Sequence, residues 1–150
     1  MPSFTLGLQQ FAAKTERELS QIVRKTCLSI GRRIIMRTPV RTGMARGNWQ
    51  TTIGYPATGT LERSDPGGAR AAAELTSKTL QWRPADGGSF FFTNNLPYIG
   101  RLEDGSSKQQ APHGMVAVTM AEFGGIVDDA SWGGAADTGG TSWDIGGAGE

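Results

Sequence analysis

Apolar residues recur at steps of three and four positions through the first part of the chain. One face of a helix collects every third or fourth residue, so this spacing predicts an amphipathic helix over about residues 8–37. The helix is expected to end before Pro39, because the residue before a proline avoids the helical conformation. At 1.5 Å per residue it is about 45 Å long, and such a helix in a small domain usually packs on a sheet or on another subunit. Its apolar positions include Leu8, Phe11, Leu19, Ile22, Val23, Cys27, Ile30, Ile34 and Ile35.

Two short segments have the pattern of strands. Residues 48–53 alternate weakly and place Trp49, Thr51 and Ile53 on one face. Residues 89–93 contain three consecutive phenylalanines, a composition typical of a strand that is buried on both faces or contacts a subunit.

The remaining segments predict loops and shorter helices. Residues 54–68 are rich in glycine and proline, which predicts a long loop or a mobile hairpin arm. A helix is expected over about residues 67–79 with Asp65 as its cap. A helical turn is expected within residues 96–102, and a final helix over about residues 113–128.

Glycine is concentrated toward the C-terminus. Nine of the 22 glycines follow Glu122, and no lysine or arginine follows Lys108. We therefore expect an α+β domain over residues 1–129, with a long N-terminal helix packed on a small, mostly antiparallel sheet and two shorter helices. Residues 130–150 are expected to form a flexible glycine-rich arm.

Charge is distributed unevenly along the chain, although the net charge is only +1. Residues 1–49 hold nine basic and two acidic residues, a net charge of +7, and residues 50–150 hold six basic and twelve acidic residues, a net charge of −6. Such a chain can stack head to tail on copies of itself or dock on an acidic partner. The basic helix face with Arg24, Arg32 and Arg33 is a candidate assembly face, and a solvated helix face is the alternative.

Few residues are available for catalysis or metal binding. A single cysteine and a single histidine exclude an internal disulfide framework and the usual four-ligand zinc sites within one chain. Cys27 lies in the apolar stripe, where a thiol usually acts as a small hydrophobe. The adjacent Glu103 and Asp104 are more typical of a turn or an ion pair than of an acid/base pair. We therefore expect no enzymatic activity, cofactor or metal, and an enzyme centred on His113 is the alternative.

Two segments, TPVRTGMARGNW (38–49) and FFFTNNLPYIGRLEDGSSKQQAPHGMVAVTMAEF (90–123), occur in this order behind the long helix. Together they resemble the tail-completion or neck proteins of long-tailed bacteriophages, the minor tail protein Z-like group. The resemblance covers about residues 8–128. The sequence departs from the pattern at Arg41, where aspartate is commoner, and in the doubled Gln109–Gln110.

The residues that carry the resemblance have two interpretations: they build the fold of the monomer, or they place loops 39–48 and 103–114 at subunit contacts. Asparagine amides after a strand tie off free backbone groups, and Glu103 is expected to pair with Arg41 or Arg46. Gly105 is expected to adopt a positive φ. The motif residues are Arg41, Thr42, Gly43, Trp49, Asn94, Asn95, Pro97, Tyr98, Glu103, Gly105, Gln110, Pro112 and Gly114.

The resemblance implies a structural virion protein made in the bacterial cytoplasm. It implies a subunit of an oligomeric ring, expected to be hexameric, at the head–tail junction of a siphovirus. Its partners would be copies of itself and the adjoining neck, connector, tail-terminator or tail-tube proteins, with genomic DNA in the lumen and no membrane. A small DNA-binding protein that uses the basic N-terminal half is the alternative from another class.

Overall fold

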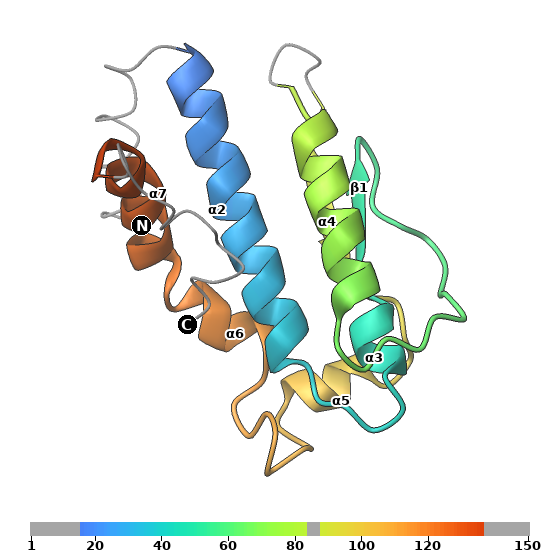
Figure 1. The fold of residues 1–150 in the computed structure, drawn as a ribbon. Coiled ribbons are helices and arrows are strands. Elements are labelled where there is room, and N and C mark those ends of the chain that lie inside the picture. Colours follow the sequence, from blue (N-terminus) through green and yellow to red (C-terminus); the bar gives the residue numbers. More distant parts are fainter. Residues whose placement is uncertain (1–15, 84–87, 137–150) are drawn as a thin grey trace.

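The computed structural model describes residues 16–83 and 88–136 of the 150-residue chain. The α+β prediction is confirmed: a long N-terminal helix, a small antiparallel sheet and several shorter helices follow one another along the chain (Figure 1). The elements are α2 (Glu16–Arg37), α3 (Met44–Gly47), β1 (Gln50–Ile53), α4 (Ala69–Gln81), β2 (Phe90–Thr93), α5 (Ile99–Glu103), α6 (Val116–Met120) and α7 (Phe123–Ala136).

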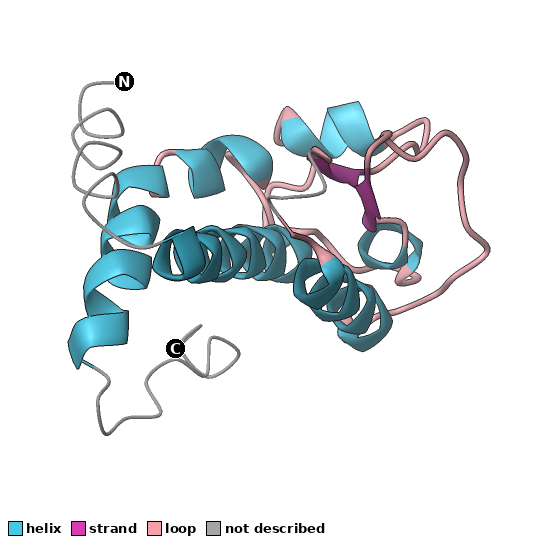
Figure 2. Cartoon of the chain, turned by 90° about the horizontal axis from the view of Figure 1, so that it is seen from above, coloured by secondary structure: helices cyan, strands magenta, loops and turns pink. Residues whose placement is uncertain are grey.

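Helix α2 runs through the middle of the molecule and ends at Arg37, as the proline at position 39 predicts. Residues 8–15 of the predicted helix lie outside the described residues. Helix α4 packs along one side of α2, and α6 and α7 pack along the other (Figures 1 and 2). Gly31 lets α4 approach closely, because a Cβ at this position would lie 2.5 Å from Leu75 Cδ2.

The sheet has two strands, β1 and β2, which pair antiparallel with Thr52 opposite Phe91. Helix α4 lies between α2 and β1 and contacts both. The predicted packing of α2 toward the sheet is present in the core that they share, where Ile34 and Ile35 of α2 cluster with Trp49 and with Phe92 of β2, and α4 adds a second helix against β1. The main core joins all three layers through Ile34, Ile35, Trp49, Ala71, Leu75, Ala111 and Met115.

The predicted final helix is two helices. It does not begin at residue 113, and the chain turns at Ala121 and Glu122, where α6 ends and α7 starts. Helix α7 then continues to Ala136, past the predicted domain boundary at residue 129, with Ala130 and Ser131 buried.

The reason for this continuation is a second, smaller apolar cluster between α7 and the N-terminal half of α2. It consists of Ile22, Val127 and Ala130, with Leu19 and Phe123 packed against it. The high glycine content of the tail concealed this apolar face. The part of the predicted arm over residues 137–150 lies outside the described residues.

Residues 54–68 form a long loop, as predicted. Helix α3, about one turn long, interrupts a stretch that the sequence predicts as a loop, and α5 lies where the sequence predicts a helical turn. Within the part of the chain that the structure describes, no helix combines the length and apolar character needed to cross a membrane.

Candidate functional site

The first motif begins where α2 ends, and its residues tie that end to the sheet. The Thr38 hydroxyl donates to the Ile34 carbonyl at 2.7 Å and accepts the Trp49 indole N–H at 2.8 Å. The Trp49 ring stacks on Phe92 of β2, with centroids 4.9 Å apart. Thr38 and Trp49 are both buried, so this pair fixes the direction in which the chain leaves the helix.

Arg46 closes the C-terminal end of α2. Its guanidinium donates to the carbonyls of Met36 and Thr38 at 2.8 and 2.9 Å, and to the Pro66 carbonyl at 2.8 Å. Cations are favoured here because the last carbonyls of a helix lack partners. Burial lowers the pKa of Arg46, and the charge of Asp65 opposes that shift.

Gly43 lies at the crossing of two loops. Its φ is +88°, and its carbonyl accepts the N–H groups of Gly47 and Asp65. A Cβ at this position would lie 2.6 Å from the Pro66 nitrogen, so both the backbone conformation and the packing require glycine. The loop contact also brings the Asp65 carboxylate to the first turn of α4, where it accepts the Ala71 N–H at 2.8 Å, the capping role predicted for it.

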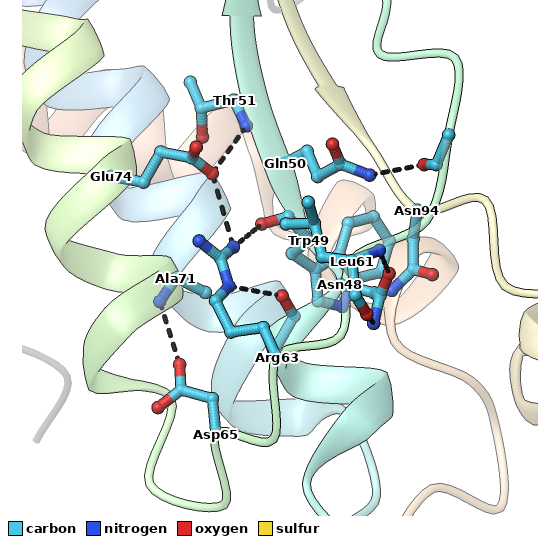
Figure 3. Close-up of polar contacts among 12 residues, drawn as sticks. Asn48, Trp49, Gln50, Thr51, Leu61, Arg63, Asp65, Ala71, Glu74 and Asn94 are labelled. Carbon is cyan, nitrogen blue, oxygen red and sulfur yellow. Dashed lines mark hydrogen bonds and ion pairs between the residues drawn. The ribbon is translucent and has the colours of Figure 1, made fainter.

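A polar group that sequence reasoning missed surrounds Asn48, which is fully buried (Figure 3). The Asn48 amide donates to the carbonyls of Met44 and Leu61, and its oxygen accepts the Leu61 N–H at 2.7 Å. Arg63 donates to the Gly47 and Trp49 carbonyls and forms a 3.3 Å ion pair with Glu74. The sequence could have indicated Asn48, because it is a polar residue directly before a predicted strand. No local pattern points to Arg63.

Glu103 of the second motif caps helix α6. Its carboxylate accepts the N–H groups of Met115, Val116 and Ala117, each at 2.9 Å. Burial alone raises the pKa of Glu103, but the three N–H donors outweigh it and hold the pKa below its usual value. The predicted ion pair with Arg41 or Arg46 is wrong, because these backbone donors occupy the carboxylate instead.

Two glycines make this cap possible. Gly105 has a φ of +92°, as predicted, and a Cβ there would lie 2.3 Å from the Pro112 carbonyl. Gly114 has a φ of +88°, and a Cβ there would lie 2.4 Å from the Glu103 carbonyl. The Glu-Asp-Gly and Pro-His-Gly segments therefore fit into each other, and each glycine makes room for the other segment.

As expected, the motif asparagines after β2 bind free backbone carbonyls of neighbouring segments. The Asn94 amide donates to the Ala45 carbonyl at 2.9 Å, and the Asn95 amide donates to the carbonyls of Ala57 and Gly59. Pro97 is exposed, and Tyr98 is half-buried at the start of α5.

Gln110 joins the two motifs. Its side-chain oxygen accepts the Val40 N–H at 2.7 Å, and its amide donates to the Val40 carbonyl at 3.2 Å. We call this pair the Gln110–Val40 clasp. It brings the loop of Arg41 and Thr42, both exposed, beside the loop before α6.

The three arginines predicted to form an assembly face have different surroundings. Arg24 donates to the Trp82 carbonyl at 2.7 Å and lies over the Trp82 ring. Arg33 pairs with Glu122 at 2.7 Å. Among the described residues, Arg32 has no hydrogen-bond or ion-pair partner. Arg24 and Arg33 therefore bind groups of their own chain, and of the three only Arg32 remains a candidate for an assembly contact.

The described residues bring no catalytic group together. His113 is exposed. Cys27 is half-buried in α2, and burial raises the pKa of its thiol to about 11, which disfavours the reactive thiolate. The described ranges contain no group of three or more histidine, cysteine or acidic side chains placed to hold a metal ion.

No family model, curated protein or solved structure matches this chain.

Proposed function

We propose that this chain is a structural subunit of a bacteriophage neck. It completes the tail and joins it to the DNA-filled head as part of a homo-oligomeric ring, expected to be sixfold, that surrounds the DNA channel. The observation that carries the proposal is the Gln110–Val40 clasp, because it joins the two segments that resemble the tail-completion family. The motif residues around the clasp hold backbone groups in place, which is the task of a structural subunit.

The clasp leaves a surface suited to contacts with other subunits. Arg41, Thr42 and Gln110 are exposed beside one another, on loops whose backbone is held from within by Gly43 and Glu103. Preorganised loops lose little conformational entropy on assembly, which favours their use as contact surfaces.

The alternative, a DNA-binding protein using the basic N-terminal half, has less support. Arg24, Arg33, Arg37 and Arg46 of this half all bind groups of the same chain. Each of these four arginines uses donors within the chain, which leaves Arg32 and Arg41 among the more available groups, whereas a DNA interface needs several arginine and lysine groups that are free to contact phosphates.

Disruption of the gene in the phage that carries it tests the proposal. Without the protein, DNA-filled heads and free tails should accumulate separately in electron micrographs, and expression of the wild-type chain from a plasmid should restore joined particles. Joined, infectious particles in the absence of the protein would contradict the proposal.

A further inference from the structure

The two edges of the β1–β2 sheet differ in what covers them. The Gly54 N–H donates to the Ser89 carbonyl, and the register pairs Thr52 with Phe91. In an antiparallel ladder, hydrogen-bonded pairs alternate with non-hydrogen-bonded pairs. Thr52 and Phe91 therefore bond to each other, and the residues on either side of them direct their N–H and C=O groups away from the partner strand.

Charged side chains close the outer edge of β1. The Glu74 carboxylate accepts the Thr51 N–H at 3.4 Å, and Arg63 donates to the Trp49 carbonyl at 3.1 Å (Figure 3). Glu74 and Arg63 also pair with each other. This edge is blocked for another strand.

Within residues 16–83 and 88–136, no such contacts close the outer edge of β2. Among the described residues, none bonds to the backbone N–H or C=O of Phe90 or Phe92. The strand contains no charge and no proline, the features that usually keep an edge from pairing. Its aromatic residues also have high strand propensity, and a two-stranded sheet gains stability from further strands.

We propose that β2 pairs antiparallel with β2 of a second copy of this chain. The occupant follows from the symmetry of the strand about Phe91. In a two-fold arrangement, the outward groups of Phe90 meet those of Phe92 of the second copy, and Phe91 lies opposite Phe91 of that copy. Every outward backbone group of the three phenylalanines then has a partner. The central aromatic pair adds cross-strand contact on the face opposite the Trp49–Phe92 stack.

This contact goes beyond the proposed ring. A two-fold contact joins the same surface of both copies, whereas the contacts of a cyclic ring join two different surfaces. Pairing over one four-residue strand buries much less than the roughly 1,200 Å² of a stable interface. The dimer is therefore weak, and its population depends on protein concentration.

Single-cysteine variants in a Cys27→Ala background test the pairing. Phe91→Cys should form an intermolecular disulfide under mild oxidation, because opposed residues of an antiparallel non-hydrogen-bonded pair lie close enough. Thr52→Cys is the matched control on the same sheet face, one strand farther from the two-fold axis in each copy. It should stay monomeric in the same gel, and circular dichroism should show both variants folded.

Sedimentation of the otherwise unaltered chain supplies a second, independent measurement. Monomer should convert to dimer as the concentration approaches the millimolar range. Phe91→Lys should weaken this dimer at least tenfold, whereas Thr52→Lys should change it less. A chain that forms no dimer at any concentration, or a dimer that Phe91→Lys leaves intact, would overturn the proposal, as would equal disulfide yields from the two cysteine variants.

Discussion

Helix α2 is held by different kinds of interaction where its C-terminal end meets the sheet and along the side that faces α7. At its C-terminal end, which we call the motif end, the buried Thr38 hydroxyl joins the Ile34 carbonyl to the Trp49 indole, and the buried Asn48 amide binds the backbone of Leu61. At its N-terminal half, α7 packs through the small cluster around Ile22 and Val127. Near the C-terminal end of α2, Arg37 binds Glu122 through two hydrogen bonds and Arg33 through one, which holds the turn before α7. We call this second arrangement the latched helix.

The comparison teaches where the molecule is rigid. At the motif end, the buried Thr38, Asn48 and Trp49 hold the chain, and the loss of one of their contacts leaves an unpaired buried atom. The latched helix depends on a few apolar contacts and a partly exposed ion pair. We therefore expect local opening of α7 to require much less free energy than opening of the motif end.

The largest predicted difference comes from replacing one glycine by alanine in each region, Gly114→Ala beside the motif end and Gly125→Ala in the latched helix. Gly114 has a positive φ and no room for a Cβ, so Gly114→Ala should lower the free energy of unfolding by about 2–4 kcal/mol. Gly125 lies in α7 with open space around it, so Gly125→Ala should raise stability by up to about 1 kcal/mol. Urea denaturation measures the free energy of unfolding of both variants. Equal effects would remove the distinction between the motif end and the latched helix.

Thr38→Val should have the next largest effect. It leaves the buried Trp49 indole N–H without an acceptor, a loss of about 1–3 kcal/mol. Thr38→Ser keeps the hydroxyl and is the matched control, expected to retain most of that energy. Both are measurable by urea denaturation followed by tryptophan fluorescence. A valine variant as stable as the serine variant would show that the hydrogen bond is unimportant.

Gln110→Ala should have a smaller effect, because the clasp is exposed. Loss of its two bonds to Val40 should cost about 0.5–1.5 kcal/mol. Gln109→Ala removes the neighbouring exposed glutamine, which has no bonded partner among the described residues, and should be neutral. Thermal unfolding of both variants tests the pair, and a larger loss for Gln109→Ala would contradict the assignment of Gln110 as the motif residue.

Local patterns predicted elements that depend on neighbours in sequence. The helix end before Pro39, the positive φ of Gly105 and the strand of phenylalanines all follow from the residues themselves. The pattern of α7 was misread, because four of its fourteen residues are glycine and the apolar contacts that hold it come from α2.

The candidate site was predictable in its residues but not in its contacts. Glu103 was recognised as important, yet its partners are the backbone N–H groups of α6, which depend on how two turns fold over each other. Arg33 and Arg24 were assigned to an open face from charge alone. Glu122 lies 89 positions from Arg33 along the chain, so no local pattern could predict their pairing.

Glu122→Gln should have the smallest effect on global stability, about 0.5 kcal/mol, since the ion pair is partly exposed. Hydrogen exchange should nevertheless become faster in α7 and stay unchanged in β1.

The hydrogen bond from Arg37 is the main cause that holds the pKa of Glu122 below its usual value; burial opposes this shift, and Arg33 reinforces it. A carboxyl with a lowered folded pKa stabilises fully above its unfolded pKa, about 4.3 for glutamate, and loses that contribution as pH falls through the folded value. The wild-type chain should therefore lose protection in α7 below about pH 4, whereas Glu122→Gln should show little of this acid step, and an equal step in both chains would exclude Glu122 as the group that holds α7.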